Sequence, residues 1–201
     1  MSTRKVLLVA LAAALLGAVV GLFSSGAGPL FRTEFGQRLL QGWLERDAPA
    51  PPTGTPVAQV GDRIPTLTLP DLEGRRVTLP EAAAGRPMLI NLWASWCAPC
   101  IEEMPELQRF AASQGEDGVQ VVGIALDERA PVLDFLQKVP VDYLILLDVA
   151  GPADAGVKLG NTRGVLPYTV LVGADGRVLK RRIGPFEKGE IDGFAAEVTR
   201  R

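Results

Sequence analysis

Two cysteines, Cys97 and Cys100, stand two residues apart in the sequence WCAPC and are the only cysteines of the chain. This spacing has four chemical interpretations: half of a zinc site, a haem attachment site, a structural disulfide, or a redox-active pair. A zinc site needs about four ligands, and the chain has no histidine and no second cysteine pair. Covalent haem attachment requires a histidine directly after the second cysteine, where Ile101 stands. A structural disulfide that closes so short a loop gains little stability from chain entropy, so a redox-active pair is the interpretation that remains.

The pair lies where a buried strand is expected to end and a helix to begin. Residues 88–93 (MLINLW) form a continuous apolar run, which is typical of a strand buried on both faces. A helix is expected from about residue 98 to residue 113, and the N-terminus of a helix favours an anion. The thiolate is the nucleophile in disulfide exchange. We therefore expect Cys97 to be exposed, with a lowered pKa, and Cys100 to be more buried and able to resolve a mixed disulfide.

Several neighbours of the pair fit this position. Pro99 is tolerated in the first turn of a helix, where its missing N–H donor costs nothing. Glu102 and Glu103 are favourable partners for the helix dipole. Trp93 is expected in the core, whereas Trp96, next to Cys97, is expected to shape the surface on which a partner docks.

Apolar periodicity along the rest of the chain predicts one α/β domain. Strands are expected at residues 67–69, 77–79, 88–93, 119–126, 143–147, 168–172 and 177–182. Helices are expected at residues 98–113, 131–138 and 187–200. Strands that alternate with helices and end in a hairpin and a final helix predict an α/β sandwich with a mixed sheet.

The N-terminal segment predicts export. Arg4 and Lys5 precede an uncharged apolar run at residues 6–23, and basic residues before such a run favour a cytoplasmic N-terminus. The run is longer than a usual signal-peptide core and nearly spans a bilayer, although Ser25–Ala27 offers a small-residue cleavage site. We assign residues 1–27 to a signal anchor or a signal peptide. Either one delivers the cysteines to an oxidising compartment.

Residues 28–58 are expected to connect this segment to the domain at 59–201. Residues 30–47 predict an amphipathic helix, in which apolar side chains recur at every fourth position: Phe31, Phe35, Leu39 and Trp43. We interpret it as a spacer that lies on the lipid surface or on the domain. Ala48–Pro56, rich in proline, predicts a stiff linker. The formal net charge of −2 gives no basic excess that would suggest nucleic acid.

Three blocks of sequence together resemble a known superfamily. These are WASWCAPC followed by Pro105, VVGIALDE at residues 121–128, and the segment that begins with Leu166-Pro167-Tyr168-Thr169. They resemble the thioredoxin superfamily and, more narrowly, the membrane-anchored TlpA/ResA/CcmG-like thiol-disulfide oxidoreductases. The resemblance covers about residue 60 to the C-terminus. It implies a thioredoxin-like sandwich, a mixed β-sheet flanked by helices with an N-terminal edge hairpin.

The resemblance also implies roles for individual residues. Cys97 would be the attacking thiol and Cys100 the resolving thiol. Pro167 would be a cis-proline that faces the disulfide, and Leu166 just before it would contact the client. No cofactor beyond the Cys97–Cys100 disulfide is implied.

Asn91 departs from thioredoxin, which carries a buried aspartate at this strand position. Because asparagine cannot accept a proton from Cys100 as a carboxylate would, we hypothesise that Glu103 or a water molecule assists instead. The alternative is that Glu103 is only a surface carboxylate near the helix dipole.

The function implied by the resemblance is reduction of oxidised cysteines in exported client proteins, for cytochrome c maturation or copper-centre assembly. The domain would face the periplasm, anchored in the inner membrane, and a membrane electron-transfer protein would re-reduce it. Two alternatives stay open: a disulfide-donating oxidase and a copper-delivery module of thioredoxin fold. The reduction potential discriminates the first, and a copper titration of the reduced protein discriminates the second.

Overall fold

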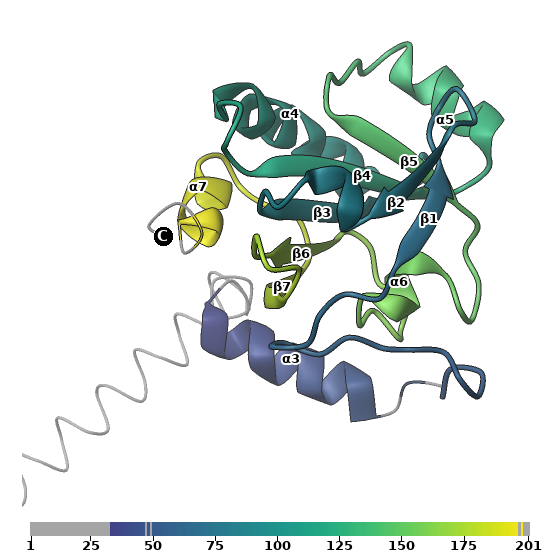
Figure 1. Cartoon of the computed structure of the whole chain (residues 1–201), viewed down its shortest axis with the longest axis vertical. Coiled ribbons are helices and arrows are strands. Elements are labelled where there is room, and N and C mark those ends of the chain that lie inside the picture. The colour runs from purple at the N-terminus through teal and green to yellow at the C-terminus, as the bar shows by residue number, and fades with distance from the viewer. Residues whose placement is uncertain (1–32, 47, 49, 197, 199–201) are drawn as a thin grey trace, which may run out of the picture. The chain divides into compact units, whose positions relative to one another are not determined.

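A five-stranded mixed sheet is the centre of the computed structural model, which describes residues 33–46, 48, 50–196 and 198. Its strand order is β5-β4-β3-β6-β7. The strands are β3 (Met88–Trp93), β4 (Gln120–Leu126), β5 (Leu144–Asp148), β6 (Tyr168–Val172) and β7 (Val178–Ile183). Strands β3, β4 and β5 run parallel, whereas β6 pairs antiparallel with both β3 and β7. This confirms the mixed sheet predicted from the sequence (Figure 1).

Three helices pack on one face of the sheet. They are α4 (Ala98–Ser113), α5 (Arg129–Leu136) and α7 (Glu190–Ala195). Leu107 and Phe110 of α4 and Ile191 of α7 share one buried cluster with Leu89 of β3. A second cluster joins Val132 of α5 to the end of β3 and the cysteine pair. Successive side chains of a strand point to opposite faces of the sheet, so the strands contribute apolar side chains to this face and to the opposite one.

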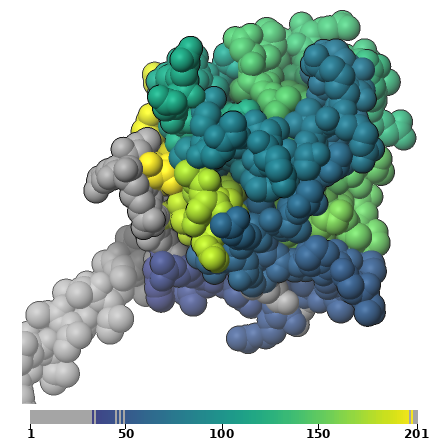
Figure 2. Space-filling model, in the orientation of Figure 1, coloured from purple at the N-terminus to yellow at the C-terminus, as the bar shows by residue number. Residues whose placement is uncertain are grey.

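The opposite face is covered by short elements, some of them far apart in sequence. They are the antiparallel pair β1 (Leu67–Pro70) and β2 (Arg76–Leu79), the 3-10 turn η1 (Glu81–Ala83) and α6 (Ala155–Lys158). Their buried side chains join one cluster with Ile90, Ile124 and Val170 of the sheet. In Figure 2, the blue atoms, which include this hairpin and its neighbours in sequence, cover a large part of the face turned to the viewer. The hairpin forms its own two-stranded sheet, and an isolated bridge between Asp71 and Leu146 joins it to the edge strand β5, as expected of an edge hairpin.

Some predicted boundaries differ from the structure. Helix α5 begins two residues earlier than expected, and α7 begins at Glu190 rather than at residue 187. The residue before α7, Gly189, has φ 84°, a left-handed conformation that cannot continue a right-handed helix backwards. Helix α6 was not predicted, because four residues give no apolar period to read. Helix α7 ends at Ala195, and residues 196 and 198 form turns, so the last helix is shorter than the predicted 187–200.

The chain divides into two compact units, residues 1–46 and 47–201. In the first, the structure describes α3 (Glu34–Arg46), within the predicted amphipathic helix. Phe35, Leu39 and Trp43 are 68%, 56% and 60% exposed. The apolar run at residues 6–23 and Phe31 lie outside the described residues. Within the described part of the chain, no helix is long and apolar enough to cross a membrane.

Candidate active site

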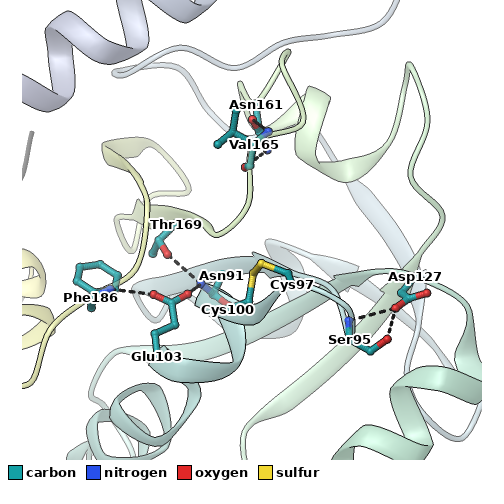
Figure 3. Close-up of a disulfide and its surroundings, with 10 residues drawn as sticks. All are labelled: Asn91, Ser95, Cys97, Cys100, Glu103, Asp127, Asn161, Val165, Thr169 and Phe186. Carbon is teal, nitrogen blue, oxygen red and sulfur yellow. Dashed lines mark hydrogen bonds between the residues drawn. A yellow bond between two sulfur atoms is a disulfide. The ribbon is translucent and has the colours of Figure 1, made fainter. Parts of the chain in front are cut away.

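The structure joins Cys97 and Cys100 in a disulfide at the start of α4 (Figure 3). Cys97 is the N-cap residue with an extended backbone (φ −88°, ψ 96°), and Pro99 lies in the first turn. The Cys97 carbonyl accepts the N–H groups of Cys100 and Ile101 at 3.0 and 3.1 Å. The predicted junction of β3 and α4 is thus confirmed, and the sulfur atoms lie where the positive end of the helix dipole favours a thiolate.

The expectation that Cys97 is exposed is wrong for this oxidised form. Cys97 is 5% exposed and Cys100 is fully buried. The disulfide joins the Cys97 sulfur to Cys100 of α4, and both cysteines belong to one packed cluster with Ala94, Met104 and Leu166. Trp96, by contrast, is 70% exposed. The surface beside the disulfide is therefore presented by Trp96 and the exposed Pro99 rather than by the sulfur atoms themselves.

The carboxylate of Asp127, the residue after β4, holds the turn that leads into Cys97. Asp127 Oδ2 accepts hydrogen bonds from the Ser95 N–H at 3.1 Å and from the Ser95 hydroxyl at 2.5 Å. Figure 3 shows this pair on the Cys97 side of the disulfide. Sequence reasoning missed both residues. The signal that was available is that Asp127 directly follows a buried strand, and parallel β3 and β4 end at the same edge of the sheet.

Glu103 is a buried carboxylate one helical turn after Cys100. It is 1% exposed, so the alternative of a surface carboxylate is wrong. Its Oε1 accepts a hydrogen bond from Asn91 Nδ2 at 2.8 Å, and its Oε2 accepts the Phe186 N–H at 3.0 Å. Asn91 Nδ2 also donates to Thr169 Oγ1 at 3.0 Å. Residues i and i+3 share a face of a helix, so Glu103 lies on the Cys100 side of α4, as Figure 3 shows.

Burial raises the pKa of Glu103 from 4.5 to about 7. Removal from water disfavours the charged form of a carboxyl group. The Phe186 N–H, the Asn91 amide and the positive charge of Arg182 act in the opposite direction and lower the pKa. The result is a carboxyl group that can hold or release a proton near neutral pH.

Arg182, on β7, is a second residue that the sequence did not single out. It is 7% exposed and donates through Nη2 to the Pro185 carbonyl at 3.0 Å and to Glu190 Oε2 at 2.7 Å. Its guanidinium lies 4.5 Å from the ring centre of Phe186. These contacts fix the segment whose Phe186 N–H reaches Glu103.

The loop before β6 forms the other wall of the site. The Leu166–Pro167 peptide bond is cis, in agreement with the resemblance. Leu166 packs against the cluster that contains both cysteines. The buried side chain of Asn161, 4% exposed, holds Val165 in this loop by both of its backbone groups. The structure thus brings the expected residues Cys97, Cys100 and Leu166 into one cluster, and Glu103 lies on the same helix as Cys100. Trp96 and Pro167 are the sequence neighbours of Cys97 and Leu166.

Comparison with known proteins agrees with this geometry. The model that describes the Redoxin family matches residues 59–197. The chain belongs to the Redoxin family. ResA of Bacillus thuringiensis, a thiol-disulfide oxidoreductase, is 29% identical over 144 residues, 70% of this chain and 79% of the relative. DsbE of Allochromatium vinosum, a thiol:disulfide interchange protein, is 35% identical over 140 residues, 68% of this chain and 73% of the relative.

A solved structure is similar to this chain as well. It is the crystal structure of a Chlorobium tepidum protein assigned as a thiol:disulfide interchange protein DsbE, with a TM-score of 0.60 and 26% identity. The match covers 71% of this chain and 97% of that protein. The chain is therefore a thiol-disulfide oxidoreductase of the ResA and DsbE type with a thioredoxin-like fold.

Proposed function

We propose that this protein reduces disulfides of exported client proteins through Cys97 and Cys100. The observation that carries the proposal is the disulfide at the N-terminus of α4, with the exposed Trp96 on one side and the buried Glu103 on the other. An exposed apolar side chain beside the sulfur atoms offers a contact for a client. The buried carboxyl group of Glu103 offers a proton acceptor for the reaction.

In the reduced protein, the Cys97 thiolate attacks one sulfur of a client disulfide. A mixed disulfide forms, and the other client sulfur leaves as a thiolate. Cys100 then loses its proton and attacks the Cys97 sulfur, which releases the second client thiolate. Two electrons have passed to the client, and the Cys97–Cys100 disulfide has formed.

Glu103 is our candidate for the group that accepts the Cys100 proton. It lies one turn after Cys100 on the buried face of α4, and its pKa is raised to about 7. A base works best when its pKa lies near the operating pH. Asn91 cannot take this role because an amide does not accept a proton at this pH, but its hydrogen bond fixes the Glu103 carboxylate.

The setting of the reaction is part of the proposal. The apolar run at residues 6–23 with its basic flank supports a tether in the inner membrane with the domain in the periplasm. A tether raises the effective concentration of the domain near a membrane electron-transfer protein that would re-reduce it. The clients would be cysteine-containing exported proteins, in cytochrome c maturation or in copper-centre assembly.

Trapping with Cys100→Ser tests the proposal. Without the resolving thiol, Cys97 should remain joined to its client, and the covalent complex can be isolated from cells and identified by mass spectrometry. The matched control is Cys97→Ser, which should give no such complex. If Cys100→Ser accumulates no mixed disulfide either, the proposed function is wrong.

The reduction potential tests the direction of electron flow. Disulfide oxidoreductases span roughly −270 to −120 mV, and a client reductase should lie toward the negative end. Equilibration of Cys97–Cys100 with glutathione buffers measures the value. A potential near the other end of the range would contradict the proposed direction and favour a disulfide-donating oxidase.

A further inference from the structure

The backbone of Asn161, between α6 and the loop that leads to Pro167, is held by hydrogen bonds on both sides. Its own N–H donates to the Gly156 carbonyl at 2.8 Å, and its carbonyl accepts the Gly164 N–H at 3.1 Å. The N–H of Ala155 in turn donates to Asp148 Oδ2 at 2.7 Å, which ties α6 to the end of β5. The backbone of Asn161 is therefore anchored to the sheet.

The Asn161 side chain acts on Val165 as a neighbouring strand would. Its Nδ2 donates to the Val165 carbonyl at 2.9 Å, and its Oδ1 accepts the Val165 N–H at 3.1 Å (Figure 3). Both backbone groups of one residue are thus engaged on one side of the loop. In a β-sheet, the same pattern is made by one residue of an adjacent strand.

This pair of hydrogen bonds fixes the direction of the next N–H group. The carbonyl of Val165 and the N–H of Leu166 belong to one trans peptide unit, in which they point in opposite directions. Because the carbonyl points toward Asn161, the Leu166 N–H points away from it. Among the described residues, the Leu166 N–H has no hydrogen-bond partner, while the Leu166 side chain packs on the cluster of Cys97 and Cys100.

We propose that Asn161 is a positioning residue for client recognition: by holding both backbone groups of Val165, it presents the Leu166 N–H to the extended segment of a client whose disulfide meets Cys97. This inference rests on the proposed function. Asn161 touches neither the client nor the sulfur atoms. It acts through Val165 and Leu166, and it sets the affinity for an extended polypeptide without altering the chemistry of the cysteine pair.

The test compares two disulfides that differ in whether they can add an extended segment. One is a synthetic peptide of about ten residues that carries a disulfide, and the other is 2-hydroxyethyl disulfide, which has no polypeptide backbone. The variants are Asn161→Ala and Asn161→Asp in the full chain. Asp keeps an acceptor for the Val165 N–H but cannot donate to the Val165 carbonyl, and its similar shape leaves no cavity. Thr162→Ala, in the same loop, is the matched control.

For both Asn161 variants, we expect kcat/KM for the peptide to fall about 3- to 10-fold, the range that one lost hydrogen bond gives. The fall should appear as a higher KM with little change in kcat. The rate with 2-hydroxyethyl disulfide and the glutathione equilibrium of Cys97–Cys100 should match those of wild type and Thr162→Ala.

Two results would overturn the inference. Either kcat/KM for both disulfides falls by the same factor, which indicates a general structural role, or neither changes. These outcomes are separate from a failure of the proposed function, in which the wild-type protein itself would not reduce the peptide disulfide.

Discussion

Glu103 and Asn91 are joined by a hydrogen bond of 2.8 Å inside the core, between a carboxylate on α4 and an amide on β3. Thioredoxin carries its buried carboxylate on the strand, whereas here the strand bears the amide and the helix bears the carboxylate. The buried carboxylate of this protein therefore lies on the helix, one turn after Cys100. This arrangement leads to predictions for stability and for the exchange reaction.

The first prediction concerns the pH dependence of folding stability in the oxidised protein. The pKa of Glu103 is about 7 in the folded state against an ordinary value of 4.5. Between these values, the folded state holds a proton that the unfolded state has lost, so stability decreases as pH rises through this window. The loss is on the order of 3 kcal/mol. Urea unfolding between pH 4.5 and 8 measures it, and Glu103→Gln should flatten the decrease. A Glu103→Gln profile as steep as that of wild type would show that another group is responsible.

The second prediction concerns the resolving step. If Glu103 accepts the Cys100 proton, Glu103→Gln should slow the attack of Cys100 on a mixed disulfide between Cys97 and glutathione by roughly 100-fold. Stopped-flow measurement of glutathione release gives the rate. In wild type, the rate should increase through about pH 7 as Glu103 loses its proton.

Glu102→Gln is the matched control for this measurement. Glu102 is the preceding residue of the same helix turn and is exposed, so its removal changes the charge near the cysteines without removing the buried base. Its rate should stay within about twofold of wild type, in keeping with the small effect of an exposed charge. Equal slowing by both substitutions would assign the effect to charge near the helix terminus instead of to proton transfer.

The third prediction is that Asn91→Asp makes stability strongly dependent on pH. It places a second carboxyl group within hydrogen-bond distance of Glu103, and two adjacent carboxylates cannot both ionise without large cost. The variant should be destabilised much more at pH 8 than at pH 5, where the pair shares a proton. Urea midpoints at the two pH values measure this. A uniform destabilisation at both values would mean that only the hydrogen bonds of Asn91 matter.

The sequence predicted β3 and α4 to the residue, because a fully buried strand is a continuous apolar run and the cysteine pair with its proline marks the start of the helix. It did not predict α6, which has only four residues. The unexpected positions share a cause: each depends on contacts distant in sequence. The buried Glu103 accepts a hydrogen bond from Phe186, 83 residues away, and Ser95 donates one to Asp127, 32 residues away. The local pattern of apolar and polar residues does not indicate hydrogen bonds between residues so far apart in the sequence.

The burial of Trp93 could be predicted from the sequence, but the residues that pack against it could not. Its burial was predicted from its place on the apolar strand and is complete. The reason it fits is on the neighbouring strand. Gly123 of β4 faces the Trp93 indole and the Tyr143 ring, and a Cβ at this position would lie 3.2 Å from an atom of each. A glycine in a strand marks such a close approach, but the sequence does not tell what approaches.

The last prediction uses this contact. A methyl group at position 123 would lie 2.7 Å from Ile145 Cδ1 as well as 3.2 Å from Trp93 Nε1 and Tyr143 Cε2. The Ile145 terminus can turn away, but the Trp93 side chain is fully buried and has no room to move. Gly123→Ala should therefore destabilise the protein by about 1–3 kcal/mol, the usual cost of overpacking a core. Urea unfolding of the oxidised protein measures the change.

Gly193→Ala is the comparison, since it adds the same methyl group where, among the described residues beyond its chain neighbours and the backbone of its own helix, no atom lies within 4 Å. Gly193 lies inside α7, and alanine is favoured over glycine in a helix by about 1 kcal/mol. The two substitutions should thus change stability in opposite directions. If Gly123→Ala leaves stability unchanged or raises it, β4 does not approach Trp93 as closely as the structure shows, and the packing behind the cysteine pair would have to be revised.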